Sequence, residues 1–302
     1  MERRAFLLKA SIVGAGALAT PMLSRLPEAW GAGACHFGST AQQRSGQTQQ
    51  EALHQLERLV GRRFSTVHNR MAWDVPLVNS YSTWAVKGGR TPILSWFARR
   101  PTGSLIGFRS IANGDHDRWI THQARSLRRS GWSGYLCWHK EPEDETNPAE
   151  WKAAYARVRR IFKNVGVTRF RWVVCLIAST YAKGEARRWL PRADWDLLGV
   201  DTNNRYTCRG FPWKPFPTLF GPAHDFARAR GKKLFVVEFA SVEGEAGRKA
   251  QWFDNARATI KSWPEVVGVS HINENSDCTY WVNTSQSALG AFRRMAFDPY
   301  FK

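Results

Sequence analysis

The segment KLFVVEF, residues 233–239, belongs to a set of short apolar or β-branched runs that decide the fold. Runs of this kind predict β-strands. Eight of them recur along the chain, and their starting positions are on average 33 residues apart, which suits one strand, one helix and two loops. They cover residues 35–38, 64–68, 92–97, 134–139, 169–176, 197–201, 233–239 and 266–272.

Helical patterns fill the gaps between these runs. Asn147 and Pro148 are typical of the N-cap and first turn of a helix, which Gly166 ends. An apolar face predicts another helix over residues 49–60, ended by Gly61. Similar patterns cover residues 118–130, 222–230 and 248–263, and the helix expected before the third strand has the weakest pattern.

The alternation of strands and helices extends over the 268 residues that follow position 34. It predicts an α/β fold, a (β/α)8 TIM barrel in a single domain, in preference to an open sheet. A composition of 43% apolar residues is sufficient for a large core. Functional residues of such a barrel lie at the C-terminal ends of its strands and in the loops that follow.

Two carboxylates end apolar runs, Glu238 after residues 234–237 and Glu141 after residues 135–139. They are 97 residues apart, or three repeats, which assigns them to the fourth and seventh strands. Two carboxylates about 5 Å apart are what double displacement at an anomeric carbon requires. The pair therefore predicts a retaining glycoside hydrolase. A structural alternative for Glu238 is neutralisation by an arginine, and three acidic residues, 143–145, compete with Glu141 for its role.

Aromatic and polar residues near the strand ends are candidates for substrate binding, because sugars present apolar C–H faces that stack on aromatic rings. Candidate aromatic platforms at strand ends or in the following loops are Trp73, Trp96 and Trp281. Further candidate substrate-binding residues at strand ends are His139, Asp201, Asn203, Tyr206 and His271. Tryptophans expected in the core, because they lie on helical faces, are Trp151, Trp252 and Trp263.

The residues around both carboxylates resemble glycoside hydrolase family 26, whose members are mostly endo-acting β-mannanases. The similar segments are 111–117, 138–143, 199–201, 237–241 and 249–252, within a likeness that extends from about Phe37 to Phe301. This resemblance implies that Glu141 is the acid/base and Glu238 the nucleophile, and that the substrate is a β-linked polysaccharide, with β-1,4-mannan first. Cleavage of a glycosidic bond by two carboxylates needs no cofactor.

The chain departs from the family pattern at two places. The family usually has histidine directly before the acid/base, whereas here Lys140 precedes Glu141 and His139 lies one residue earlier. A neighbouring lysine lowers the pKa of a carboxyl group and opposes proton donation near neutral pH. Adjacent strand residues face opposite sides, so Lys140 either faces Glu141 or points away. After Asp201, residues 202–204 stand where mannanases tend to carry an aromatic residue. A non-catalytic glycan-binding barrel is therefore the alternative.

Residues 1–34 resemble a twin-arginine-type export signal, because Arg3 and Arg4 precede a short apolar run and residues 32–34 suit cleavage. We expect a secreted or extracytoplasmic protein with a catalytic domain over residues 35–302 and no membrane span in its mature form. Cysteines can pair in an exported protein. Cys208 and Cys278, in loop-like stretches, are the disulfide candidates, and two others, 137 and 175, are expected as buried thiols.

The formal net charge of the chain is +19, of which residues 35–302 carry +17. Such a charge attracts polyanions, and a polyanion-binding or cell-wall-binding protein is a further alternative. The basic residues are scattered along helical segments without a nucleic-acid module signature, which favours a solvated basic surface that contacts anionic cell-wall polymers. No cysteine or histidine spacing indicates a metal site, and we expect a monomer.

Overall fold

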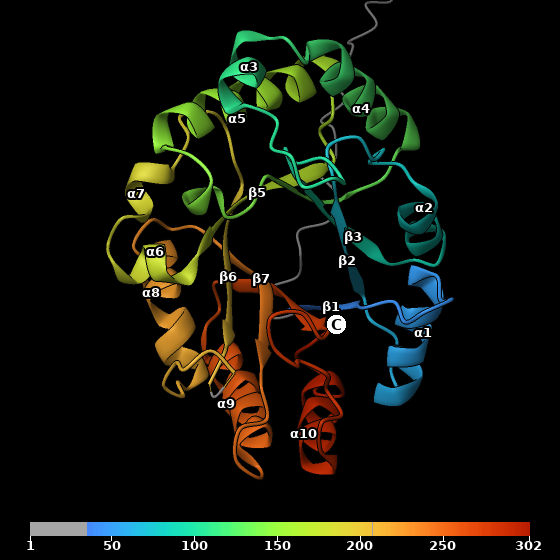
Figure 1. The fold of residues 1–302 in the computed structure, drawn as a ribbon, viewed down its shortest axis with the longest axis vertical. Coiled ribbons are helices and arrows are strands. Elements are labelled where there is room, and N and C mark those ends of the chain that lie inside the picture. The colour runs from blue at the N-terminus through green and yellow to red at the C-terminus, as the bar shows by residue number, and fades with distance from the viewer. Residues whose placement is uncertain (1–34, 207) are drawn as a thin grey trace, which may run out of the picture. The chain divides into compact units, whose positions relative to one another are not determined.

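The computed structural model describes residues 35–206 and 208–302. Within this part of the chain, eight parallel strands close a barrel in which each strand pairs with the next and β8 pairs with β1. The helices form a ring around the barrel, in which α10 returns to the side of α1 (Figure 1). The predicted (β/α)8 barrel is therefore confirmed. The predicted export signal lies outside the described residues.

Each predicted run overlaps a strand, with ends that differ by at most a few residues. The strands are β1 (His36–Ala41), β2 (Thr66–Met71), β3 (Thr91–Trp96), β4 (Gly134–Trp138), β5 (Phe170–Ile177), β6 (Leu197–Asn204), β7 (Leu234–Ser241) and β8 (Val266–Asn273).

The helices follow the strands, with two short additional ones after β5. They are α1 (Gln49–Val60), α2 (Ser80–Lys87), α3 (Phe108–Asn113), α4 (Asp117–Ser130), α5 (Pro148–Val165), α6 (Ala178–Ala182), α7 (Ala186–Trp189), α8 (Phe216–Arg228), α9 (Arg248–Ser262) and α10 (Gln286–Ala296), together with the 3-10 turn η1 (Pro142–Asp144).

Helix α8 begins six residues before the predicted start, so Pro222 lies inside it. Proline in a helix interior removes one backbone hydrogen bond and is costly. Phe216 and Phe220 are fully buried on the same helix, and Phe216 packs on Trp252 of α9. Burial of these two rings offsets the cost of the proline, because each aromatic side chain removes a large apolar area from water.

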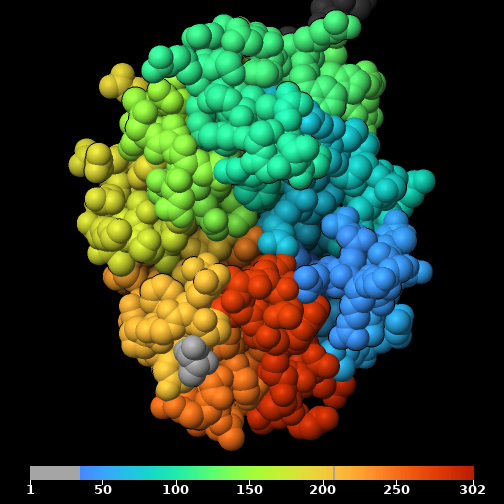
Figure 2. Space-filling model, viewed as in Figure 1, coloured from blue at the N-terminus to red at the C-terminus, as the bar shows by residue number. Residues whose placement is uncertain are grey.

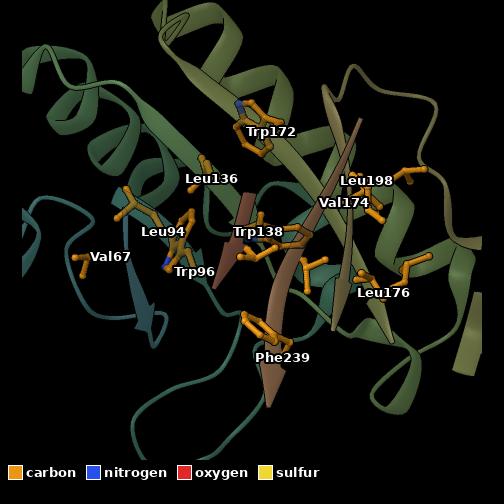
Figure 3. Packing of buried hydrophobic residues seen from close by; sticks show 14 of the residues in the cluster. Val67, Leu94, Trp96, Leu136, Trp138, Trp172, Val174, Leu176, Leu198 and Phe239 are labelled. Atoms are coloured by element: carbon orange, nitrogen blue, oxygen red, sulfur yellow. The ribbon is translucent and has the colours of Figure 1, made fainter. Parts of the chain in front are cut away.

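Two apolar layers hold the barrel together, as the alternation of side chains along the strands requires. Even-numbered residues of β3 and β4, such as Leu94 and Leu136, face the helices, and Figure 3 shows these side chains among the tryptophans of that layer. The opposite face of the strands fills the barrel interior, with Ile93, Tyr135, Cys137, Val173, Cys175, Leu197, Phe235 and Val237. These side chains fill the barrel beneath its C-terminal mouth and hold the strand ends in fixed positions.

The candidate disulfide and buried thiols have definite places in this fold. Cys208 and Cys278 form a disulfide, with Cα atoms 5.9 Å apart, that joins the loop after β6 to the loop after β8. Cys137 and Cys175 are buried free thiols on β4 and β5. The expectation of buried thiols at these two positions agrees with the structure.

Candidate active site

The chain turns sharply where β4 ends. His139 has a φ of 46° and Glu141 a φ of 57°, so both have left-handed backbone conformations that non-glycine residues seldom adopt. Each such residue costs of order 1–3 kcal/mol and persists only where its surroundings hold it, often at functional sites. Because the strand ends at Trp138, the alternation expected of a strand does not apply to Lys140, and its side chain turns toward Glu141.

The Lys140 ammonium group lies at the centre of a cluster of carboxylates. Its Nζ atom is 2.8 Å from Oε1 of Glu141, 2.5 Å from Oδ2 of Asp201 and 3.1 Å from Oε1 of Glu238. Lys140 is only 6% exposed. Burial alone would lower its pKa, but these carboxylates outweigh burial and raise the pKa well above its usual value. Lys140 is therefore a buried cation that links β4 to β6 and β7.

A bulge on β7 directs Glu238 into this cluster. Val200 pairs with Val236, but the next residue, Asp201, pairs with Glu238, so Val237 is an extra residue on β7. Val237 lies in the barrel interior, and strict alternation would turn Glu238 toward the helices. The extra residue resets the alternation, which is a common use of bulges near active sites. Glu238 and Asp201 therefore share one face.

Basic and neutral donors surround Glu238, which is 5% exposed. Its Oε1 atom lies 3.8 Å from Arg70 Nη1 and 3.8 Å from His68 Nδ1. Burial raises the pKa of Glu238, but Lys140, Arg70 and His68 together lower it to about 2. The Nε2 atom of His68 lies 2.7 Å from Ser95 Oγ, and burial lowers the pKa of this histidine to about 3. At neutral pH Glu238 is thus ionised and His68 is neutral.

The spacing of Glu141 and Glu238 follows from their shared partner. Both Oε1 atoms contact Lys140 Nζ, at 2.8 and 3.1 Å, so they can lie no more than about 6 Å apart. Such a close contact is compatible with the separation of about 5–5.5 Å between the two carboxyl groups of retaining glycosidases. The Glu141 side chain is 33% exposed and that of Glu238 only 6%, so Glu141 is the more accessible from solvent.

The protonation states within the cluster differ. Burial raises the pKa of Glu141, yet Lys140 and a hydrogen bond with Asp201 lower it below its usual value. Burial and the carboxylates of Glu141 and Glu238 raise the pKa of Asp201 well above its usual value. The shift at Asp201 has a geometric cause, because three carboxyl groups around one ammonium group leave an excess of negative charge.

Two candidate histidines are too deeply buried to bind a substrate, and these predictions were wrong. His139 is fully buried, its Nδ1 atom accepts a hydrogen bond from the Ala98 amide at 3.0 Å, and its Nε2 atom lies 3.0 Å from Glu145. His271 is fully buried against Phe253 of α9 and another ring of α10. His271 has the same parity on β8 as helix-facing Val269, whereas the left-handed backbone at His139 turns its ring toward Phe108 of α3.

The predicted platforms Trp73 and Trp96 were also wrong. Trp96 is 0% exposed and Trp73 is 2% exposed, and their rings stack at 4.7 Å between centroids. Trp96 faces the helices because it has the same parity on β3 as Leu94 (Figure 3). Phe97, the next residue, is half-buried, and Lys140 Nζ lies 5.9 Å from the centre of its ring. An aromatic face beside the carboxylates thus belongs to Phe97.

The other predicted binding residues lie around the barrel mouth and are partly exposed. Asn203 follows Asp201 by two residues on β6 and so lies on the same face. The hydroxyl of Tyr206 donates to Glu245 at 2.7 Å. The ring of Trp281 lies 5.5 Å from the Arg44 guanidinium carbon. In Figure 2 the red C-terminal part of the chain lies against blue residues near the start of the described chain.

Sequence reasoning did not select Arg70 and Glu274, which border the cluster. Their side chains form an ion pair that joins β2 to the residue after β8. The signal was available for Arg70, because it has the same parity as His68 on β2 and therefore faces the barrel interior near its mouth. For Glu274 the signal was its position directly after a strand. Among residues 35–206 and 208–302, no group of three His, Cys, Asp or Glu side chains is arranged to hold a metal ion.

A (β/α)8 barrel with paired carboxylates at its strand ends is an architecture that glycoside hydrolases use. No family model matches the chain. Among curated proteins, the chain is similar to endoglucanase H of Acetivibrio thermocellus, with 25% identity over 266 residues. The match covers 82% of this chain but only 29% of that relative, so the chain spans less than a third of its length.

Solved structures with the same fold include several β-mannanases. The modular endo-β-1,4-mannanase of Cellulomonas fimi matches with a TM-score of 0.62 and 15% identity, over 89% of this chain and 72% of that one. The catalytic domain of the family 26 mannanase of Bacillus sp. JAMB-750 matches with a TM-score of 0.64 and 15% identity, over 89% and 87%. The family 26 β-mannanase of Bacteroides ovatus matches with a TM-score of 0.63 and 11% identity, over 89% and 90%.

At these identities the structural likeness shows the fold, and the expected resemblance to glycoside hydrolase family 26 is confirmed at that level. Both kinds of comparison lead to proteins that are named as hydrolases of β-linked glycans. In the described part of the chain, no helix has the length and apolar character needed to span a membrane.

Proposed function

We propose that this protein is a retaining glycoside hydrolase that cleaves a β-linked polysaccharide, with Glu238 as nucleophile and Glu141 as acid/base. The observation that carries the proposal is the shared contact of both glutamates with Lys140, which limits the distance between their Oε1 atoms to about 6 Å. Two carboxyl groups held this close suit the nucleophile and the acid/base of a retaining mechanism.

The two glutamates have different parts in this reaction. The ionised carboxylate of Glu238 attacks the anomeric carbon, and the bond to the leaving oxygen breaks with its electron pair on that oxygen. Protonated Glu141 donates its proton to this oxygen, and the ester formed with Glu238 is the intermediate. Glu141 then removes a proton from the water molecule that attacks the same carbon. Glu238 suits the first role because Lys140 and Arg70 stabilise its ionised form.

The substrate of first choice is β-1,4-mannan, because the family resemblance and the fold relatives are β-mannanases. The second is β-1,4-glucan, since the curated relative is an endoglucanase. Phe97 and Trp281 offer partly exposed aromatic faces, and Asn203 offers a polar group on the side of the cluster. Stacking on aromatic faces and hydrogen bonds to hydroxyls are how proteins hold sugars.

Release of reducing ends from a panel of polysaccharides tests this proposal. The panel contains mannan, glucomannan, mixed-linkage β-glucan, carboxymethyl cellulose and xylan, and the sample is residues 35–302. We expect release from mannan or glucomannan, with proton NMR of the first product showing the β-anomer of the substrate linkage. Glu238→Gln is the matched inactive control. No release from any member, or an initial α-anomer, contradicts the proposal.

A glycan-binding barrel without hydrolysis is the second candidate, and Lys140 is the observation that favours it. An ammonium group 2.8 Å from Glu141 opposes the protonated form that cleavage requires. Affinity electrophoresis on the same polysaccharides distinguishes the candidates. A protein that only binds glycan migrates more slowly in a gel that contains the polysaccharide but releases no reducing ends from it. A salt titration separates both from a polyanion-binding protein, since electrostatic binding weakens steeply with salt.

We also propose that the protein is exported through its twin-arginine-type N-terminus and acts outside the cytoplasm, where polysaccharides and anionic cell-wall polymers are encountered. Arg3 and Arg4 carry the proposal. The test is the cell fraction that contains the protein, followed by N-terminal sequencing of the product. Replacement of both arginines by lysine should retain the chain in the cytoplasm, and unchanged export contradicts this route.

A further inference from the structure

Lys140 contacts both candidate catalytic glutamates, but the proposed reaction gives it no bond-making or proton-transfer step. Its ammonium group lies within hydrogen-bonding distance of both candidate catalytic glutamates and of Asp201. These contacts are distributed over the turn after β4 and over β6 and β7. The side chain reaches them because the left-handed residues on either side of Lys140 turn it inward. A buried cation in this position affects the charge of the acid/base and of the nucleophile together.

Groups on most sides of the cluster contribute to its charge. Arg70 adds a second cation beside Glu238, but its guanidinium is shared with Glu274. Lys140 is therefore the cation that contacts Glu141 directly. The titratable and charged groups that face the cluster are His68 and Arg70 on β2, Glu143 after β4, Cys175 on β5, Asp201 on β6, Glu238 on β7 and Glu274 after β8.

We infer that Lys140 is a positioning residue that keeps Glu141 and Glu238 ionised together, so that at neutral pH the protein cleaves bonds to good leaving groups much faster than ordinary glycosidic bonds. The inference rests on the proposed function and adds a preference among substrates. It concerns Lys140 itself, which stands where the resembled family usually has histidine.

The two steps of the reaction respond to Lys140 in opposite ways. In the first step Glu238 forms a bond to the anomeric carbon and the leaving oxygen departs with the electron pair. With Glu141 ionised, that oxygen receives no proton and departs as an anion, which a nitrophenolate tolerates and a sugar alkoxide does not. In the second step Glu141 must accept a proton from water, and its ionised form is the reactive one. Lys140 therefore slows the first step and not the second.

The charge of Glu238 is consumed when the intermediate forms, because its carboxylate becomes a neutral ester. In ordinary retaining enzymes this loss is what lowers the pKa of the acid/base between the two steps. Here Lys140 already offsets the charge of Glu238, at 3.1 Å, and lowers the pKa of Glu141 before any ester exists. The alternation of Glu141 between acid and base is thereby biased toward base.

A leaving-group series tests the inference on residues 35–302. The probes are aryl β-mannobiosides and aryl β-cellobiosides, from 2,4-dinitrophenyl to phenyl, with whichever sugar is cleaved. At pH 7 we expect kcat/KM to fall steeply from dinitrophenyl to phenyl. In Lys140→Met the slope of log kcat/KM against the pKa of the leaving group should become shallower. The kcat/KM for the phenyl glycoside should rise about tenfold or more relative to that for the dinitrophenyl glycoside, because one pKa unit changes the fraction of protonated Glu141 tenfold.

Lys163→Met is the matched control, since Lys163 is an exposed lysine that pairs with Asp194 on the surface. It should leave the slope unchanged. An equally steep slope in folded Lys140→Met overturns the inference. A merely structural role for Lys140 would lower kcat/KM for all leaving groups by a common factor and leave the slope where it was.

The unaltered protein provides a second test that no folding defect can obscure. Its kcat/KM for polysaccharide should decline as the pH rises from acid to neutral, whereas that for the dinitrophenyl glycoside should stay level over this interval. Coincident pH profiles overturn the inference. Absence of cleavage of every polysaccharide and every aryl glycoside contradicts the proposed function instead, so the two failures are distinguishable.

Discussion

Asp201 of β6 is the register partner of Glu238 on β7, although strict alternation would turn the two side chains to opposite faces. The extra residue Val237 corrects this mismatch and directs Glu238 toward Asp201 and Lys140. The cluster therefore depends on one irregularity in an otherwise regular barrel. Its chemistry leads to four predictions beyond the tests already given.

Removal of either candidate catalytic carboxyl group should abolish most hydrolysis while sugar binding persists. We expect Glu141→Gln to lower kcat on unactivated substrate by about 10²–10⁴-fold, the range of general acid–base catalysis, and Glu238→Ala to lower it at least as much. Kinetics and affinity electrophoresis measure the two effects. Glu143→Gln is the matched control for the competing acid on the same turn. Retained turnover in Glu238→Ala would refute the mechanism.

Two neighbouring aromatic residues at the end of β3, Trp96 and Phe97, should differ in whether they support stability or substrate binding. Trp96 is fully buried, so Trp96→Ala should lower the free energy of unfolding by about 3–5 kcal/mol. Phe97 is half-buried beside Lys140, so Phe97→Ala should chiefly raise KM for polysaccharide and change stability much less. Urea denaturation and steady-state kinetics on the same two variants decide this. A raised KM with little loss of stability in Trp96→Ala would instead indicate that Trp96 contacts the substrate.

The cysteine pair should be oxidised in the exported protein. Cys208 and Cys278 are separated by 70 residues, so cross-linking them should stabilise the protein by about 4 kcal/mol in the chain-entropy account. Non-reducing peptide mapping should recover the linked peptides, and Cys208→Ser with Cys278→Ser should lower the urea midpoint. Cys35, Cys137 and Cys175 should react with an alkylating reagent only after unfolding, because they are buried. Full labelling of all five without denaturant would contradict the pairing.

Lys249 of α9 should make stability depend on pH. Its Nζ atom is buried and donates to the Trp281 carbonyl at 2.6 Å, and burial lowers the pKa from 10.5 to about 7, although Glu243 opposes this. Between pH 7 and 10.5 the unfolded chain thus binds more protons at this site than the folded protein. By linkage, this lysine's contribution makes the folded state more stable as pH rises over that interval.

Lys249→Met removes this titration. The difference in unfolding free energy between variant and wild-type protein should be most favourable to the variant at pH 7 and below. It should shrink as the pH rises toward 10. Urea titrations at pH 6, 7, 8 and 9 measure the difference directly, with Lys261→Met as the matched lysine control on α9. A difference that is constant with pH would show that Lys249 does not titrate in this range.

Much of the barrel was predictable because its signals are local. The runs that contain β4 and β7 are apolar over the length of one strand, and the Asn147–Pro148 start and Gly166 end of α5 act through the adjacent backbone. Repeated strand and helix patterns of this spacing have few alternatives to a closed parallel barrel. The helix with a misplaced start, α8, contains Pro222, where tertiary packing of Phe216 and Phe220 outweighs a local preference.

The candidate site was predictable in its parts and not in its arrangement. Glu141, Asp201 and Glu238 could be selected because each follows or ends an apolar strand. Trp96 was wrongly assigned to the substrate site because its position at the end of β3 was considered without the alternation of side chains. It lies two residues after Leu94 and therefore faces the helices, as Leu94 does. The partnership of Arg70 with Glu274 needed closure of the barrel, which brings β2 close to the loop after β8.

What the sequence by itself determined is the eightfold repeat and the carboxylates that follow two of its apolar runs, because strand propensity and burial of apolar runs act within a few residues. Only the tertiary structure decided where Lys140 points and what surrounds Glu238. The left-handed backbone at His139 and Glu141 and the bulge at Val237 are held by contacts among strands far apart in sequence. Such contacts set the charge of each carboxylate, since electrostatic energy depends on distance in space and on burial.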